Sequence, residues 1–139
     1  MTSSRLSANN KKRKRKRILF VDDEPDITSL FRLSLTRAGF DMDAFNDPLL
    51  ALKSFKQNEY DLLLLDIVMP KMDGYELYER LKEIDSNVKV CFITASEMHR
   101  KELRKERQCD LDRDLFLQMP LPIKRIVEEI SRRIDSSSP

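Results

Sequence analysis

The fold of this chain is decided by the stretch Leu62-Leu63-Leu64-Leu65-Asp66-Ile67-Val68-Met69-Pro70. Four consecutive leucines show no alternation of apolar and polar residues, so both faces of the segment are predicted to be buried. The run is too short to span a membrane and Pro70 follows it closely, which is typical of a central strand in a parallel sheet. Asp66 then stands where the buried strand ends. A carboxylate is costly to place there unless it has a use, so we expect the chemistry of the protein at Asp66.

Apolar strands and helical patterns alternate on both sides of this stretch. The predicted strands cover residues 18–21, 40–45, 60–66, 88–93 and 115–117, and the predicted helices cover 25–38, 48–55, 75–84, 97–108 and 123–134. Such alternation predicts an α/β fold, with a parallel sheet and helices on both faces. Residues 40–45 alternate apolar and acidic side chains, as an edge strand does, whereas 18–21 and 62–65 are wholly apolar. We therefore predict a five-stranded parallel sheet with the flavodoxin-like order 2-1-3-4-5.

Helical periodicity also predicts which side chains face the core. The first two helices are expected to bury Ile27, Leu30, Phe31, Leu35, Leu49, Leu50, Leu52 and Phe55. Gly39 suits a left-handed cap after the first helix. Cys91 lies within a predicted strand and is expected in the core.

Length and composition indicate one domain with a heavily charged surface. The chain has 139 residues, of which 40% are hydrophobic and 36% are charged. No apolar run suits a spanning helix or a signal peptide, so the cytoplasm is the expected compartment. Two cysteines and one histidine make a disulfide framework or a Cys/His zinc site an unfavourable interpretation.

The charge is distributed unevenly. Residues 1–17 contain eight of the 26 Lys and Arg residues and no acid, so the rest of the chain is net acidic. We predict a disordered basic arm over 1–17, one domain over 18–135 and a frayed tail over 136–139. The arm is interpreted either as a solvated tail or as a contact for nucleic acid or another polyanion, through Lys11, Lys12, Arg13, Lys14, Arg15, Lys16 and Arg17.

Acidic side chains gather at the predicted strand ends. Asp22 and Asp23 follow the first strand, Asp66 ends the third, Thr94 follows the fourth, and Met119 lies just beyond the fifth. Parallel strands open on one edge of the sheet, so the three carboxylates should converge there. By itself, Asp22-Asp23 also fits a polar loop with a helix cap. Converging carboxylates repel one another, and a hard cation such as Mg²⁺ resolves that repulsion.

The chain resembles the response-regulator receiver domains of two-component phosphorelays. The resemblance rests on Val21-Asp22-Asp23-Glu24-Pro25, on Asp66 with Met69-Pro70 and Asp73-Gly74, and on Phe92-Ile93-Thr94-Ala95. It implies that Asp66 accepts a phosphoryl group from a sensor histidine kinase or phosphotransfer protein. It also implies Mg²⁺ bound by Asp23, Asp66 and the Val68 backbone carbonyl, with Asp22 acting through water. Thr94 and Phe116 would be the switch residues.

Two positions depart from or modify the family pattern. Met119 occupies the place of the family's lysine, which pairs with the acids and then with the phosphoryl group, so coupling to a conformational switch is in doubt. Val68 cannot orient an attacking water, so we expect a long-lived acyl phosphate. Lys71, His99 or Arg100 are alternative sources of the missing charge, but simple loss is the favoured interpretation.

Two function classes remain open. The first is a stand-alone phosphoacceptor, not an enzyme in the ordinary sense, that signals by binding a downstream protein through the face of helix 97–108, the fifth strand and the last helix. The second is a receiver-fold binding module that works without phosphorylation and uses the basic arm. Helix 97–108 also fits an ordinary solvated surface. An enzyme acting on a small metabolite is disfavoured, because the predicted edge carries no catalytic histidine or cysteine.

Overall fold

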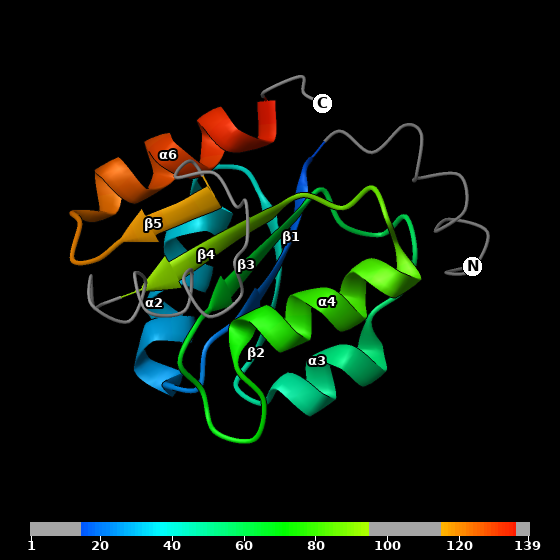
Figure 1. Ribbon diagram of the computed structural model, residues 1–139. Coiled ribbons are helices and arrows are strands. Elements are labelled where there is room, and N and C mark those ends of the chain that lie inside the picture. The colour runs from blue at the N-terminus through cyan, green and yellow to red at the C-terminus, as the bar shows by residue number, and fades with distance from the viewer. Residues whose placement is uncertain (1–14, 95–114, 136–139) are drawn as a thin grey trace, which may run out of the picture.

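The predicted parallel sheet is confirmed. The computed structural model describes residues 15–94 and 115–135. Five parallel strands lie in the order β2-β1-β3-β4-β5 (Figure 1). Their bounds are β1 (Arg17–Val21), β2 (Asp41–Phe45), β3 (Leu62–Asp66), β4 (Val90–Thr94) and β5 (Phe116–Gln118). The predicted order is correct, and β2 is an edge strand as its alternating sequence indicates.

Four described helices cover the two faces of the sheet. They are α2 (Pro25–Arg37), α3 (Pro48–Ser54), α4 (Gly74–Ile84) and α6 (Ile123–Asp135). Helices α3 and α4 lie on one face, and α2 and α6 lie on the other (Figure 1). The predicted helix 97–108 and its His99 and Arg100 lie outside the described residues. No helix in the described part is both long enough and apolar enough to cross a membrane.

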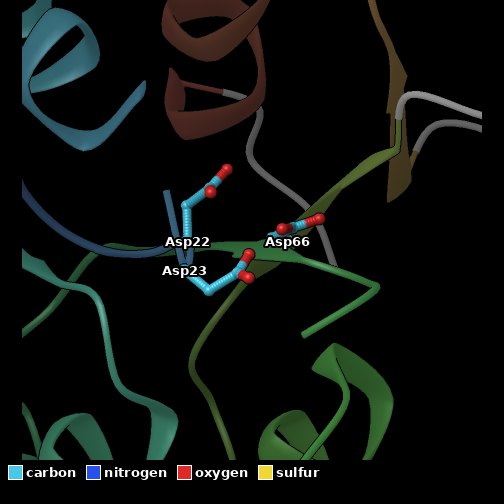
Figure 2. Close-up of side chains that lie close together, drawn as sticks. All are labelled: Asp22, Asp23 and Asp66. Atoms are coloured by element: carbon cyan, nitrogen blue, oxygen red, sulfur yellow. The ribbon is translucent and has the colours of Figure 1, made fainter. Parts of the chain in front are cut away.

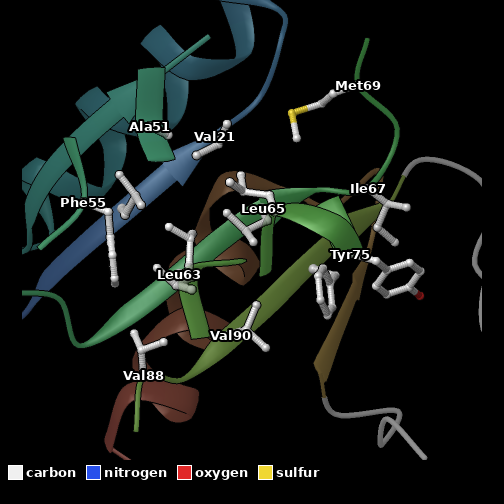
Figure 3. Close-up of a cluster of buried hydrophobic side chains, with 14 of the residues drawn as sticks. Val21, Ala51, Phe55, Leu63, Leu65, Ile67, Met69, Tyr75, Val88 and Val90 are labelled. Carbon is white, nitrogen blue, oxygen red and sulfur yellow. The ribbon is translucent and has the colours of Figure 1, made fainter. Parts of the chain in front are cut away.

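The sheet separates two apolar cores because side chains alternate along each strand. Leu63, Leu65 and Val21 point toward α3 and α4, where they pack with Ala51 and Tyr75 (Figure 3). The intervening residues point toward α2 and α6 and pack there with Phe31, Leu35, Ile126 and Ile130. All four leucines of β3 are at most 1% exposed, so the opening stretch is buried on both faces as predicted.

The predicted buried faces of α2 and α3 are wrong at three leucines. Leu30, Leu49 and Leu50 are 45–53% exposed. Helix α2 buries Thr28, Phe31 and Leu35, and the α3 segment buries Pro48, Ala51 and Phe55. Both sets have the spacing i, i+3, i+7, and Phe31, Leu35 and Phe55 are buried as predicted, so the expected apolar faces were too wide and took in three exposed leucines. Pro48 and Ala51 are less apolar than their leucine neighbours, yet they face the sheet.

The first strand begins one residue earlier than predicted, at Arg17. The Arg17 guanidinium contacts Asp43 at 2.8 Å and Glu59 at 3.7 Å, and its backbone N–H donates to Asp61 at 2.8 Å. Arg17 therefore belongs to the folded domain, and assigning its charge to the solvated arm was wrong. Its side chain is held because Asp43, in the middle of β2, and Glu59, shortly before β3, present carboxylates beside it.

Candidate functional site

Three carboxylates converge at the carboxyl ends of β1 and β3. The register pairs Val21 with Leu65, so the residues that follow in the two strands are neighbours. Asp22, Asp23 and Asp66 (the acidic trio) each offer an oxygen within 4.8 Å of the others (Figure 2). Asp22 is 6% exposed, while the other two are partly exposed. The strand-end argument therefore placed these three residues together correctly.

The surroundings raise the pKa of two acids of the trio, Asp66 and Asp22. Burial, the charge of Asp22 and the neighbouring Asp23 raise the pKa of Asp66 to about 8, although the Val68 backbone N–H opposes this by donating to the carboxylate. Burial and the charge of Asp23 raise the pKa of Asp22 to about 6, against a hydrogen bond from the Glu24 backbone N–H. Asp66 and Asp22 are thus both costly to ionise at this edge of the sheet.

A cavity of about 410 Å³ opens over the acidic trio. Its lining combines the acids with Glu24, Thr94 and the apolar side chains Ile27, Phe31, Val68, Ile93 and Met119. The described lining contains no lysine or arginine. The acids therefore share a half-apolar pocket in which no described side chain balances their charge.

Backbone hydrogen bonds hold the loops at this edge. Gly74 N–H donates to the Ile67 carbonyl at 2.8 Å, which closes the loop after Asp66 onto the start of α4. A Cβ atom at Gly74 would lie 2.4 Å from the Asp66 backbone oxygen, so only glycine fits there. Asp73 caps the same helix by accepting from the Glu76 N–H at 2.9 Å. The predicted Asp73-Gly74 turn is thus also a close packing contact behind Asp66.

The sequence that forms this acidic site matches the model of a known protein family. The model of the response regulator receiver domain matches residues 18–131. The chain belongs to this family. The predicted resemblance is therefore confirmed over nearly all of the described chain.

Relatives and solved structures agree with this assignment of the receiver domain. The chain is 33% identical over 120 residues to the response regulator receiver protein CpdR of Brucella abortus, covering 86% of this chain and 97% of CpdR. It is 31% identical to the regulatory protein PhoP of Bacillus subtilis, over 89% of this chain but 52% of PhoP. The HemR receiver domain from Leptospira biflexa has the same fold, with a TM-score of 0.76, 22% identity and coverage of 90% of this chain and 98% of that one. The response regulator TrrA from Thermotoga maritima, solved in complex with Mg²⁺ and BeF, has a TM-score of 0.67 and 29% identity, covering 84% and 97% of the two chains.

The donor atoms of the acidic trio fit a magnesium ion. Receiver domains bind Mg²⁺ at an acidic pocket, and the trio supplies hard carboxylate oxygens of the kind this ion prefers. Burial and the repulsion from the neighbouring acids raise the pKa of Asp66, and a bound cation would offset both effects. Assignment of single ligands, including the Val68 carbonyl and Asp22 through water, stays a prediction.

The predicted switch residues lie in different surroundings. Thr94 ends β4, is 2% exposed and lines the cavity, and its carbonyl accepts from the Met119 N–H at 2.8 Å. Phe116 is 5% exposed and packs away from the cavity, with its ring centroid 5.6 Å from that of Phe92 and 6.3 Å from that of Tyr75. The backbone links Thr94 directly to Met119, while the role of both predicted switch residues remains a prediction.

Met119, which the sequence predicts to stand where the family has a lysine, faces the site in this receiver domain. Met119 lines the cavity and packs with the core under α2 and α6, so a side chain here does reach the pocket. Lys71, one suggested substitute, lies 3.3 Å from Asp47 and does not line the cavity. His99 and Arg100 lie outside the described residues. Within the described part, simple loss of the lysine charge is the better interpretation.

The described basic residues of the N-terminal segment, Arg15, Lys16 and Arg17, lie at the opposite end of β1 from the acidic trio. Arg15 and Lys16 are exposed, and Arg15 lies 3.7 Å from Asp41, whereas Arg17 is held as described above. Lys11, Lys12, Arg13 and Lys14 lie outside the described residues. Cys91 is fully buried, and burial raises the pKa of its thiol to about 12, which agrees with the core position expected for it.

Sequence reasoning missed two polar residues beside the acids. Asn46 donates through Nδ2 to the Asp22 carbonyl at 2.8 Å and to Thr28 Oγ1 at 2.9 Å. The Asn46-Asp47-Pro48 sequence indicated a helix start, and Asp47 does cap α3 by accepting from the Leu49 N–H. The hydrogen bonds of Asn46 join residues far apart in the sequence, so no local sequence pattern predicts them. The one signal in the sequence was Thr28, a polar residue at a position of α2 that is buried.

Proposed function

We propose that this receiver domain accepts a phosphoryl group on Asp66 from the phosphohistidine of a sensor histidine kinase or a phosphotransfer protein. The observation that carries the proposal is the acidic trio itself, with Asp66 at the open end of the central strand. Receiver domains interact with such kinases and with downstream effectors, and they are phosphoacceptors rather than ordinary enzymes. The identity of the partners is part of the proposal.

The chain's own residues would supply position and charge control. An oxygen of the Asp66 carboxylate forms the new bond to phosphorus while the phosphorus–nitrogen bond of the donor breaks. The imidazole nitrogen keeps the electron pair and takes up a proton from solvent. Asp23, Asp66 and the Val68 carbonyl would hold Mg²⁺ directly and Asp22 through water. Bound there, the ion neutralises the carboxylates and the developing phosphoryl charge.

Output from the phosphorylated site would run through Thr94 toward β5. Its hydroxyl would bind a phosphoryl oxygen, and its carbonyl already accepts from the Met119 N–H. Phe116 would move with this loop, and the face of helix 97–108, β5 and α6 would bind the downstream protein. Met119 supplies no cation to the phosphoryl group, so we expect this coupling to be weaker than a lysine would allow. Val68 offers no group to orient water, so the acyl phosphate should be long-lived, and a half-life of seconds would contradict this.

The test is phosphorylation with Mg²⁺ and a small-molecule phosphodonor, followed by intact mass. Wild-type protein should gain one phosphoryl group and Asp66→Asn none. Asp26→Asn, a control at an exposed acid of α2 outside the acidic trio, should behave as wild type. Wild-type spectra without added mass would refute the proposal. Spectra with beryllofluoride would then show whether the amides of Thr94 and Phe116 respond together.

Met119 in the cavity favours a second candidate, a binding module that works without phosphorylation. Its output would be the basic arm, with Lys11, Lys12, Arg13, Lys14, Arg15 and Lys16 contacting nucleic acid or another polyanion. Arg17 is excluded because Asp43 and Glu59 hold it. Affinity for DNA should fall steeply with salt and should be lost when Lys11–Lys14 are replaced by glutamine. A weak, salt-independent affinity would count against this function.

A further inference from the structure

Asn46 and Thr28 form a hydrogen-bonded unit that connects three separate elements at the acidic site. Asn46, in the loop between β2 and α3, donates to the Asp22 carbonyl at 2.8 Å and to Thr28 Oγ1 at 2.9 Å. Thr28 is 5% exposed, and its hydroxyl donates to the Pro25 carbonyl at 2.9 Å in the first turn of α2. The unit thus ties the Asp22 loop to the loop after β2 and to the start of α2.

These contacts fix the peptide group between the first two acids. The Asp22 carbonyl lies in the same rigid plane as the nitrogen and Cα of Asp23. Holding that oxygen therefore fixes the nitrogen and Cα of Asp23 and restricts the directions in which its side chain can project. The Asp22 N–H is already bound to the Phe45 carbonyl at 3.1 Å, and its carboxylate accepts from the Glu24 N–H at 2.9 Å. With Asn46 in place, both sides of Asp22 along the backbone are restrained.

Only a side chain with two donors can bridge these groups. The Thr28 hydroxyl donates its proton to the Pro25 carbonyl, so it can only accept a hydrogen bond from Asn46. The Asp22 carbonyl is an acceptor as well. The two N–H bonds of one amide satisfy both acceptors at once. An aspartate at this position would direct a carboxylate oxygen toward the same two acceptors.

We propose that Asn46, supported by Thr28, is a positioning residue for the Asp22–Asp23 half of the metal site. It holds the two acids facing Asp66 against their mutual repulsion, before a cation arrives to offset it. A site organised in advance binds its ion more tightly, because less ordering remains to be done on binding. This inference rests on the proposed function, since it takes the acidic trio to be the Mg²⁺ site.

The test compares Mg²⁺ affinity with fold stability in four single variants and in the Asn46→Ala/Thr28→Val double variant. Asn46→Ala removes both donors, Thr28→Val removes the hydroxyl with little change in shape, and Thr28→Ser keeps it. Asn87→Ala makes the same chemical change in the exposed turn after α4 and serves as the matched control. Mg²⁺ dissociation constants are measured by calorimetry at a temperature where circular dichroism shows every variant folded. Thermal unfolding midpoints are measured separately.

We expect Mg²⁺ affinity to fall about tenfold in Asn46→Ala and in Thr28→Val, as is usual when a residue that orients a metal ligand is lost. Thr28→Ser and Asn87→Ala should remain close to wild type. The double variant should lose less than the two single losses combined, since both act through one hydrogen-bonded unit. An Asn46→Ala protein with a lowered unfolding midpoint but wild-type Mg²⁺ affinity would overturn the role of Asn46 and leave the proposed function of the site intact. A wild-type protein without Mg²⁺ affinity would overturn the proposed function itself.

Discussion

Replacing Gly74 with alanine should damage both the fold and the metal site. Gly74 starts α4, and its N–H donates to the Ile67 carbonyl at 2.8 Å. A Cβ atom there would lie 2.4 Å from the Asp66 backbone oxygen and 3.0 Å from the Ile67 Cα. Both neighbours are backbone atoms of Asp66, the proposed phosphoacceptor, and of the next residue, so neither can turn aside as a flexible side chain would.

The size of the effect follows from the displacement needed. Ordinary contact requires about 1 Å more space, which stretches the Gly74–Ile67 hydrogen bond beyond its normal length. Overpacking costs about 1–3 kcal/mol and the weakened bond adds about 1 kcal/mol. A loss of about 3 kcal/mol corresponds to a fall of roughly 10 °C in the unfolding midpoint of a domain of this size. Mg²⁺ affinity should weaken too, because Asp66 moves with its own carbonyl.

Calorimetric unfolding and Mg²⁺ titration measure the two effects. Gly39, the other glycine of the chain, provides the comparison. Its φ of 107° disfavours alanine, but a Cβ there would meet no atom within 4 Å, and it lies in the turn after α2. Gly39→Ala should therefore lower the midpoint through backbone strain and leave Mg²⁺ affinity unchanged. If Gly74→Ala kept both the wild-type midpoint and the wild-type Mg²⁺ affinity, the close-packing argument would be refuted.

Three further predictions concern charge. The metal-free wild type should lose stability relative to Asp66→Asn as pH rises from about 4 to about 8. The reason is that the folded state raises the pKa of Asp66 and so binds its proton more tightly than the unfolded state does. If urea denaturation in EDTA gave the two proteins the same change of stability with pH, the prediction would be contradicted. Met119→Lys should weaken Mg²⁺ affinity severalfold by placing a cation beside the acids, and Met119→Gln should not; equal titrations of these two variants would argue against it. Arg17→Ala should lower the free energy of unfolding by about 1 kcal/mol, because the partly buried Asp43 loses its partner. Arg15→Ala should lower it by about 0 kcal/mol, because its ion pair is exposed. Equal urea midpoints for the two variants would show that the Arg17 contacts do not matter for stability.

The arrangement of the sheet could be predicted because strand sequences record how many of their faces are buried. Strands β1 and β3, apolar throughout residues 18–21 and 62–65, lie inside the sheet, and the alternating β2 is at the edge. The phase of a short helix was harder to predict. Leu30 and Phe31 are adjacent and both apolar, so the pattern does not say which one faces the sheet. The sheet accepts Phe31, and Leu30 is left 45% exposed.

The acids of the site could be predicted because each stands at the end of a strand, a position that topology alone brings to one edge. Residues that support the acids could not. Asn46 and Thr28 are 18 positions apart, and their hydrogen bond depends on how β2 and α2 pack. The assignment of Arg17 failed for a similar reason. Within the sequence it ends a basic run, and only the folded sheet places Asp43 beside it.

Strand β1 has a charged or polar anchor at each end, and this has a consequence for its alignment. Its residues Ile18 to Val21 are 0% exposed and apolar, so by themselves they would tolerate sliding past their neighbours. A shift of β1 by one residue relative to its neighbouring strands would turn each side chain to the opposite core. It would also bury either Arg17 or Asp22 away from its present partners. The contacts of Arg17 with Asp43 and of Asp22 with Asn46 therefore act as stops at opposite ends of the strand. The residue that carries one acid of the site thus also helps, through its backbone carbonyl, to keep β1 in register.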